Sequence, residues 1–203
     1  MPPFTVLHVC MGNICRSPMA ERLLALAVRE RLARREVDPE RADELLHSHS
    51  AGTGGWHAGE EMNPPASRQV TSRGGSVAGF AARKLRSDHI DAADLVLTAT
   101  ADQQEYVVAL RPDAEARTFV LGEFGRLLAG VDAAALPAAG ATPDAVYARG
   151  VALVEAAHAA RLGTTSLPTD DLDDPWGRGD QCFSRVADEI EESVHPLAAV
   201  LLP

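Results

Sequence analysis

The stretch VLHVCMGNICRSPMAE, residues 6–21, decides the fold of this chain of 203 residues. An apolar, partly β-branched run over residues 4–9 predicts a buried strand that ends at Cys10. Ser17 offers a hydroxyl for a helix N-cap, Pro18 suits the first helical position, and the apolar residues that follow recur at helical spacing. The sequence therefore predicts a strand, a tight loop and a helix, with a thiol at the start of the loop and a guanidinium at its end.

A loop of this kind can bind an oxyanion. The backbone N–H groups between Cys10 and Arg16 can point toward one spot, and Gly12 can adopt a conformation closed to other residues. The following helix adds the positive end of its dipole. The same field favours the thiolate form of a cysteine, so Cys10 is predicted to be a nucleophile. The planar guanidinium of Arg16 can grip two oxygens of a phosphoryl group, which a lysine could not do.

The full string over residues 10–21, CMGNICRSPMAE, resembles the signature of the low-molecular-weight protein tyrosine phosphatase family. The spacing C-x5-R alone is a weak signal, whereas the longer string is specific. A buried core thiol at Cys10 and a surface charge at Arg16 are the alternative interpretation. The resemblance implies a phosphatase in which Cys10 and Arg16 are catalytic and which needs no metal and no cofactor. It also implies a phosphate-binding loop formed by Met11, Gly12, Asn13, Ile14, Cys15, Arg16 and Ser17.

The composition indicates one globular domain. With a mass of 21.5 kDa and 46% hydrophobic residues, the chain can bury one core, so we expect a single domain over residues 1–203. A net charge of −10 without a basic run argues against a nucleic-acid partner. The chain has neither an apolar run of transmembrane length nor a signal-peptide pattern, so we expect a cytoplasmic protein without a membrane partner. Three cysteines form no disulfide framework, and we expect a monomer or a weak dimer.

Alternating strand and helix patterns predict the fold class. Apolar runs predict further strands over residues 45–50, 94–98 and 118–121. Helices are predicted from Ser17 onward, over residues 100–110 and over residues 184–202 with an interruption at Pro196, and the family resemblance adds one within residues 66–85. This alternation implies the α/β class, a three-layer α/β/α open sheet of about four parallel strands with helices on both faces, as in the family. Ligands of such sheets bind beyond the carboxyl ends of the strands, where Cys10 lies.

An alanine-rich stretch over residues 122–170 is longer than the family resemblance implies. Thr142 and Pro143 form a helix start, and apolar residues follow at helical spacing. We expect one extra or elongated helix, packed on the edge of the sheet, as an insertion before the Asp-Pro loop. A lid, a surface for a partner and an insertion without a role of its own remain open.

A glycine-rich loop over residues 54–65 carries Trp56 and His57. A flat aromatic ring is what a phosphotyrosine site needs as a wall, and the resemblance implies that a Trp-His loop flanks the active-site cleft. Trp56 is therefore predicted to form a wall of the substrate site, the alternative being a hydrophobic plug. His57 is predicted to lie at the rim or to hydrogen-bond within the turn.

Two further positions concern the support of the phosphate loop. Ser50 lies in a Ser-Ala-Gly strand end like that of family members, where it either hydrogen-bonds Asn13 or caps the strand. Many members have a histidine two residues before an Ala-Arg pair, whereas this chain has Phe80 before Ala82 and Arg83. We therefore expect a thinner polar scaffold, or an apolar contact in its place.

The second chemical landmark is the cluster DDLDDPWG over residues 170–177. By itself such a cluster indicates a solvated turn, and a metal site is a weak second choice because the carboxylate spacing of a calcium loop is missing. The resemblance implies an Asp-Pro-aromatic loop whose aspartate is the general acid, and Asp174 matches that position. Trp176 is predicted to be the opposing aromatic wall, and Asp173 is the alternative acid.

The predicted reaction uses these groups in sequence. The Cys10 thiolate attacks phosphorus, and Asp174 protonates the leaving oxygen and then activates the water that hydrolyses the thiophosphoryl enzyme. Arg16 and the loop amides hold the equatorial oxygens. Ser17 can stabilise Cys10 as the leaving group. Cys15 either traps oxidised Cys10 as a disulfide or fills the interior of the loop.

Several functions fit a loop of this kind. Ile14 and the two aromatic loops favour a phosphatase that acts on phosphotyrosine in proteins, with phosphate or another oxyanion in the loop. In phosphoarginine phosphatases, a sister activity, Thr typically replaces this isoleucine. An arsenate reductase on the same fold needs a further cysteine pair, and only Cys182 is available. A non-catalytic phosphate-binding module is disfavoured because a nucleophile, an arginine and a candidate acid are all present.

Overall fold

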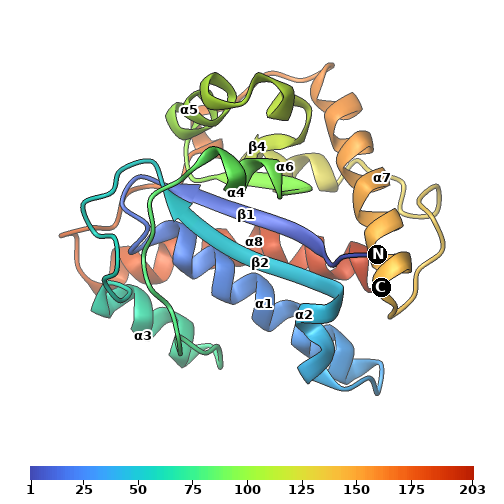
Figure 1. Cartoon of the computed structure of the whole chain (residues 1–203), viewed down its shortest axis with the longest axis horizontal. Helices are drawn as coiled ribbons and strands as arrows, with labels where there is room; N and C mark the ends of the chain where they lie inside the picture. Colours follow the sequence, from blue (N-terminus) through green and yellow to red (C-terminus); the bar gives the residue numbers. More distant parts are fainter.

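A four-stranded parallel sheet lies at the centre of the structure, a computed structural model that describes residues 1–203. The strands lie in the order β2-β1-β3-β4, and each neighbouring pair is parallel (Figure 1). Helices cover both faces of a parallel sheet, so both faces of its strands are buried. Its strands are therefore short, continuous runs of apolar residues. The predicted sheet of about four parallel strands is confirmed. Its strands are β1 (Phe4–Cys10), β2 (Leu46–Gly52), β3 (Leu95–Thr98) and β4 (Thr118–Val120).

Eight helices surround the sheet. Helices α1, α6 and α8 pack on one face, and α4 and α5 pack on the other, so the predicted three-layer arrangement is confirmed (Figure 1). No helix has both the length and the apolar character that crossing a membrane would take. The helices are α1 (Arg16–Arg34), α2 (Ala42–Leu45), α3 (Pro64–Ser72), α4 (Ser87–Asp91), α5 (Ala101–Leu110), α6 (Leu121–Leu128), α7 (Pro143–Arg161) and α8 (Asp180–Leu201). Three 3-10 turns lie between them, η1 (Pro39–Arg41), η2 (Pro112–Arg117) and η3 (Pro168–Asp170).

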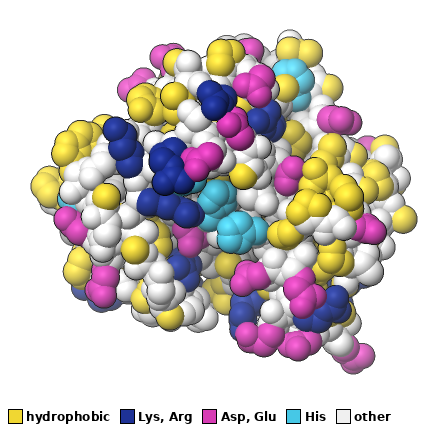
Figure 2. Space-filling view, viewed as in Figure 1, with side chains coloured by type: hydrophobic (Ala, Val, Ile, Leu, Met, Phe, Trp, Pro, Cys, Tyr) yellow, Lys and Arg dark blue, Asp and Glu magenta, His cyan; other side chains and the backbone are white.

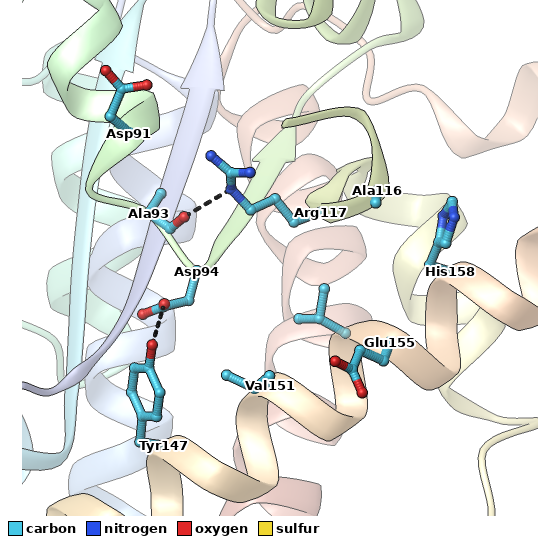
Figure 3. A pocket seen from close by; sticks show the side chains of 10 residues that line it. Asp91, Ala93, Asp94, Ala116, Arg117, Tyr147, Val151, Glu155 and His158 are labelled. Carbon is cyan, nitrogen blue, oxygen red and sulfur yellow. Dashed lines mark hydrogen bonds between the residues drawn. The ribbon is translucent and has the colours of Figure 1, made fainter. Parts of the chain in front are cut away.

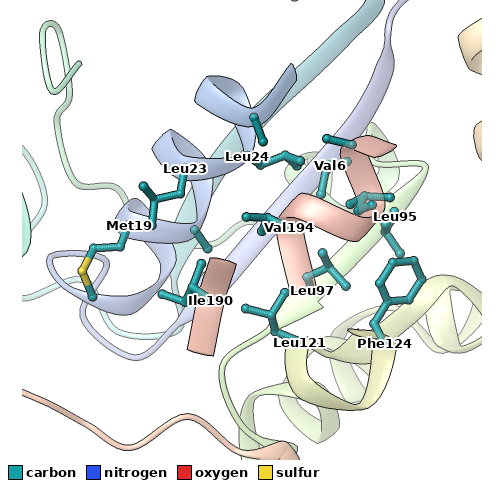
Figure 4. Packing of buried hydrophobic residues seen from close by; sticks show 14 of the residues in the cluster. Val6, Met19, Leu23, Leu24, Leu95, Leu97, Leu121, Phe124, Ile190 and Val194 are labelled. Atoms are coloured by element: carbon teal, nitrogen blue, oxygen red, sulfur yellow. The ribbon is translucent and has the colours of Figure 1, made fainter. Parts of the chain in front are cut away.

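Two apolar clusters fill the space between the layers. Successive side chains of a strand point to opposite faces, so Val6 belongs to the larger cluster and Leu7 to the smaller one. Figure 4 shows Leu24 of α1, Val194 of α8 and Phe124 of α6 packed along the sheet residues Val6, Leu95 and Leu97. The sheet is therefore held rigidly from both sides, and its strand ends are fixed in space.

The carboxyl ends of β1 and β2 lie together. The parallel register pairs Phe4 with Leu46 at one end of the two strands and Cys10 with Gly52 at the other. In Figure 1 the loops that follow β1 and β2, and the segment that precedes α8, gather at this end of the sheet. The loop after Cys10 therefore meets segments that are remote in the sequence.

Helix α7 lies at the opposite end of the sheet (Figure 1). It begins as predicted, because the Thr142 hydroxyl accepts a hydrogen bond from the Ala145 amide at 3.3 Å. Gly150 lets the helix approach the start of β1, since a Cβ there would lie 2.5 Å from the Phe4 ring. The helix thus crosses the amino end of a central strand instead of packing along the edge of the sheet, and its position excludes a lid over Cys10.

Helix α8 continues through Pro196, so the predicted interruption is wrong. Proline removes one backbone hydrogen bond in a helix interior, and this loss is tolerated where the freed carbonyl faces water. Pro196 is exposed, as is Glu192, whose carbonyl loses its donor. Leu197 and Leu201 remain fully buried beyond the proline, so packing carries the helix on.

Acid is expected to destabilise the fold through a buried histidine of β1. The Nε2 atom of His8 lies 3.2 Å from Ser48 Oγ, and its Nδ1 has no partner. Burial lowers the pKa of His8 from 6.5 to about 3, so the unfolded chain takes up the proton first as pH falls below 6.5. The free energy of unfolding should then fall by about 1.4 kcal/mol per pH unit from this residue alone.

Urea unfolding between pH 7.5 and pH 4.5 would measure this slope, and His8→Gln should make it shallower. His195→Gln is the matched control, because His195 is half exposed and lies on α8. His49 adds to the wild-type slope, since burial also lowers its pKa to about 3. An equal slope in wild type and His8→Gln would contradict the assignment.

Candidate active site

The loop between β1 and α1 wraps around one sulfur atom. Its left-handed residue is Asn13, with φ 56°, whereas Gly12 has no positive φ, so the special conformation predicted for Gly12 is wrong. At Gly12 the His57 side chain comes close, since a Cβ there would lie 3.2 Å from His57 Cδ2. The Asn13 amide N–H turns inward and lies 3.3 Å from Cys10 Sγ.

Helix α1 begins two residues earlier than predicted, at Arg16, with Cys15 as N-cap. The predicted N-cap role of Ser17 is therefore wrong. Its hydroxyl oxygen lies 3.0 Å from Cys10 Sγ, so the side chain contacts the sulfur and does not cap the helix. Pro18 occupies the third helical position, which costs nothing because the first amides of a helix have no intrahelical partner.

The two cysteines of the loop have different surroundings. Cys10 is 2% exposed and receives two donors, the Asn13 amide and the Ser17 hydroxyl, which suits a thiolate. Burial, with Cys10 and Asp174 nearby, raises the pKa of Cys15 to about 12. Cys15 is therefore held as a neutral thiol.

A directed chain of hydrogen bonds holds the loop. Asn13 Nδ2 donates to Ser17 Oγ at 3.0 Å and to Ser50 Oγ at 2.8 Å, which confirms the predicted contact between Asn13 and Ser50. Because both hydroxyl oxygens accept from the amide, each hydroxyl hydrogen must point onward. Ser17 then donates to Cys10 Sγ, and Ser50 donates to Glu21 Oε2 at 2.5 Å. The network orients a proton toward the sulfur.

Glu21 joins the hydrogen-bond network of the loop through Ser50. Burial raises the pKa of Glu21, and the bonds from Ser50 and Arg22 oppose that shift. Arg22 Nε lies 3.1 Å from Glu21, and the Arg22 guanidinium lies over the Phe80 ring at 5.7 Å from its centroid. This is a cation–π contact, and Phe80 itself is partly buried against the larger apolar cluster.

The remaining polar atom of Asn13 reaches a third segment. Asn13 Oδ1 accepts a hydrogen bond from the Arg83 amide at 2.9 Å. The sequence alone assigns no role to Arg83 or Glu21. Glu21 lies inside the quoted signature, which was a signal that it matters, but no local pattern links Arg83 to the loop.

Arg16 and Asp174 meet above the loop. The Arg16 guanidinium is 5% exposed, and it donates to the Leu172 carbonyl at 3.1 Å. Its second nitrogen lies 3.6 Å from Asp174 Oδ2. The Trp176 amide donates to the other oxygen of Asp174 at 3.2 Å. The segment before α8 thus fixes both the arginine and the carboxylate.

Asp173 points elsewhere. Its carboxylate lies 2.6 Å from Arg185 and 3.5 Å from Arg178. The hydrogen bond from Arg185 lowers the pKa of Asp173, which keeps this group ionised. Asp174, and not Asp173, therefore faces the loop.

These groups line one pocket of about 240 Å³. Trp56 and Trp176 are 72% and 64% exposed, and Met11 is 51% exposed, so three large apolar side chains form its rim. The plug interpretation of Trp56 is therefore wrong. His57 Nδ1 lies 2.8 Å from Glu60, in agreement with the predicted hydrogen bond within the turn. The pocket is lined by Cys10, Met11, Gly12, Ile14, Cys15, Arg16, Trp56, His57, Asp174 and Trp176.

A second cavity of about 480 Å³ lies between α7 and the amino ends of β3 and β4 (Figure 3). Its polar groups largely satisfy one another, since the Tyr147 hydroxyl donates to Asp94 at 3.2 Å and Arg117 Nε donates to the Ala93 carbonyl at 3.1 Å. None of the predicted site residues lines it. The chemistry indicated by the sequence is therefore confined to the pocket at the carboxyl ends of the strands.

A cysteine under converging donors, a buried arginine and a carboxylate beside one small pocket define a cysteine-dependent phosphatase. Comparison with protein families agrees, because residues 5–155 match the family described as low molecular weight phosphotyrosine protein phosphatase. The chain belongs to this family.

Individual relatives are moderately similar. A low molecular weight protein-tyrosine-phosphatase of Streptomyces coelicolor is 32% identical over 64% of this chain and 74% of its own length. A protein-arginine-phosphatase of Geobacillus stearothermophilus is 34% identical over 60% of this chain and 72% of its own length. The family thus includes both activities among these relatives.

Solved structures share the fold. The structure of a YwlE mutant from Bacillus subtilis has a TM-score of 0.64 at 20% identity, covering 97% of both chains. The tyrosine phosphatase Wzb from Escherichia coli K30, determined in complex with sulphate, has a TM-score of 0.61 at 21% identity and covers 97% of this chain and 96% of its own. At this identity the likeness establishes the fold alone.

The hydrogen-bond chain predicts the reactivity of Cys10. Ser17→Ala removes the donor that faces the sulfur, and hydrogen bonds to charged groups contribute about 1.5–3 kcal/mol. Alkylation of Cys10 by iodoacetamide at neutral pH should therefore slow about tenfold or more in Ser17→Ala. Peptide-resolved mass spectrometry measures the rate, and the partly buried Cys182 in the same sample is the internal control. Equal Cys10 rates in both proteins would contradict the assigned direction of the chain.

Proposed function

We propose that the protein hydrolyses phosphotyrosine in proteins through a thiophosphoryl-cysteine intermediate. Cys10 is the nucleophile, Arg16 binds the phosphoryl oxygens and Asp174 is the general acid. One observation carries the proposal. The Cys10 sulfur and the Arg16 guanidinium of one loop and the Asp174 carboxylate of a segment remote in the sequence line the same pocket.

The first half of the reaction transfers the phosphoryl group to sulfur. The Cys10 thiolate attacks phosphorus, the bond from phosphorus to the tyrosyl oxygen breaks, and that oxygen takes the proton of Asp174. Arg16 and the loop amides bind the equatorial oxygens, where negative charge is held throughout. The loop therefore does not need to rearrange while the bond is exchanged.

The second half returns the enzyme to its starting state. Asp174, now ionised, accepts a proton from a water that attacks phosphorus, and the bond from phosphorus to Cys10 Sγ breaks. The departing thiolate meets the donors that held it before the reaction, the Ser17 hydroxyl and the Asn13 amide. The products are phosphate and the free enzyme, and both steps use only side chains of this chain and water.

The apolar rim favours an aromatic phosphate ester. A phenyl ring fits between flat apolar walls, and Trp56 and Trp176 offer such surfaces at the pocket. Ile14, 7% exposed at the pocket, adds an apolar contact where phosphoarginine phosphatases typically have Thr. The similarity to a protein-arginine-phosphatase makes phosphoarginine the second candidate substrate. Cys182 does not line the pocket, which disfavours an arsenate reductase relay.

The setting of the enzyme follows from its chemistry. A thiolate nucleophile keeps its reactivity in a reducing compartment, so we propose that the protein works in the cytoplasm. Its partners are phosphotyrosine-containing proteins, and phosphate or another oxyanion occupies the loop between turnovers. We propose that it acts as a monomer or a weak dimer.

Hydrolysis of p-nitrophenyl phosphate and of a phosphotyrosine peptide at mildly acidic pH tests the assignment. Cys10→Ser should abolish turnover, because the intermediate cannot form and break as it does on sulfur. Asp174→Asn should reduce kcat about 10²–10⁴-fold on the peptide, because the tyrosyl oxygen then leaves without a proton.

The matched control is Asp173→Asn, which removes a carboxylate of the same loop that is engaged with Arg185. It should retain most of the activity. An Asp173→Asn variant as inactive as Asp174→Asn would overturn the assignment of the acid. A phosphoarginine peptide hydrolysed faster than the phosphotyrosine peptide would overturn the assignment of the substrate.

A further inference from the structure

Two unpaired cations lie side by side next to the pocket. Arg83 and Lys84 are exposed, and no carboxylate lies within 4.0 Å of either side chain, whereas exposed arginines elsewhere, such as Arg111 with Asp91, are paired. Figure 2 shows Lys and Arg side chains gathered on the face of the molecule over β2, close to a group of histidines. On a chain with a net charge of −10, this basic surface is a local exception.

Backbone hydrogen bonds tie this surface to the rim of the pocket. The Arg83 carbonyl accepts from the Gly52 amide at 2.9 Å, so the cations continue from the end of β2. The Gly59 amide donates to the Ala82 carbonyl at 2.7 Å, which fastens the loop of Trp56 to the same segment. The Lys84 stem packs against Gly55, since its Cδ would lie 3.2 Å from a Cβ there. Lys84 therefore adjoins the residue that precedes Trp56.

Arg83 is held in place before any ligand arrives. Its Nε donates to the Ser50 carbonyl at 2.8 Å, and a terminal nitrogen donates to His49 Nδ1 at 2.9 Å. The Arg83 side chain is nevertheless exposed to solvent. A cation that is already held in place loses little conformational entropy when it binds an anion. Little of the binding free energy is therefore offset by ordering the side chain.

Two carboxylates of adjoining segments are engaged with other residues. Glu60 lies 2.8 Å from His57, and Asp88 pairs with Arg86 through two hydrogen bonds. The positive charge of Arg83 and Lys84 is therefore available to a partner.

We propose that Arg83 and Lys84 form a docking surface for acidic side chains that flank the phosphotyrosine of a protein substrate. This inference rests on the proposed function and deepens it, because it names the class of segment that the site selects. A peptide that leaves the pocket over Gly55 passes Lys84 first. Because the cations lie outside the pocket, they act on the flanking residues and leave the phosphoryl chemistry unchanged.

The test compares two phosphotyrosine peptides that differ only in having Glu or Gln at the residues flanking the phosphotyrosine. At low salt the wild-type kcat/KM should be about 3- to 10-fold higher for the Glu peptide, and the ratio should shrink as salt is added. Lys84→Glu should lower the ratio to about one or below, with hydrolysis of p-nitrophenyl phosphate unchanged. Arg34→Glu is the matched control, an equal charge change at an exposed residue in the last turn of α1, and should keep the wild-type ratio.

A wild-type ratio of one, or a ratio that Lys84→Glu leaves unchanged, would overturn the docking surface while the proposed function stands. Affinity of the Cys10→Ser variant for the same peptides, measured by fluorescence anisotropy, separates the two proposals. If this variant binds the Glu peptide more tightly but the wild type hydrolyses neither peptide, the docking surface stands and the proposed function fails.

Discussion

The side-chain amide of Asn13 is the contact on which the phosphate loop depends. Its two hydrogens go to Ser17 and Ser50, and its oxygen accepts from the Arg83 amide, so one buried group joins three segments. Losing a buried hydrogen-bond partner costs about 1–3 kcal/mol for each group left unsatisfied. The left-handed backbone of Asn13 is tolerated because these bonds fix it.

Parallel strand register brings the partners of Asn13 to it. Pairing of Cys10 with Gly52 places the end of β2 beside the loop, and only glycine fits there, since a Cβ would lie 2.7 Å from the Met11 carbonyl oxygen. Helices α1 and α8 hold the sheet from one face through the larger apolar cluster. The geometry of the thiol thus depends on ordinary core packing as much as on the residues around it.

Local patterns in the sequence predicted the strands and the loop because each has a short-range signature, whereas Trp56, Asp174 and Trp176 were assigned to the pocket through the family resemblance. Apolar runs predict strands, and the spacing of Cys10 and Arg16 follows from one loop. The start of α1, the conformation of Gly12 and the path of α8 through Pro196 were predicted wrongly, because packing and hydrogen bonds override local preference there. The roles of Glu21 and Arg83 depend on contacts between remote segments, which no periodicity reveals.

Neighbouring residues of the same type differ in their role because their surroundings differ. Cys10 receives two donors while burial keeps Cys15 neutral, and Asp173 is taken by Arg185 while Asp174 faces Arg16. Burial and the neighbouring arginines and amides therefore decide which residue of each pair has a structural role and which one can take part in the reaction. Because a phosphoryl group is bound by the same kinds of donors, a loop that presents amides and Arg16 to an anion also holds the thiolate that attacks it.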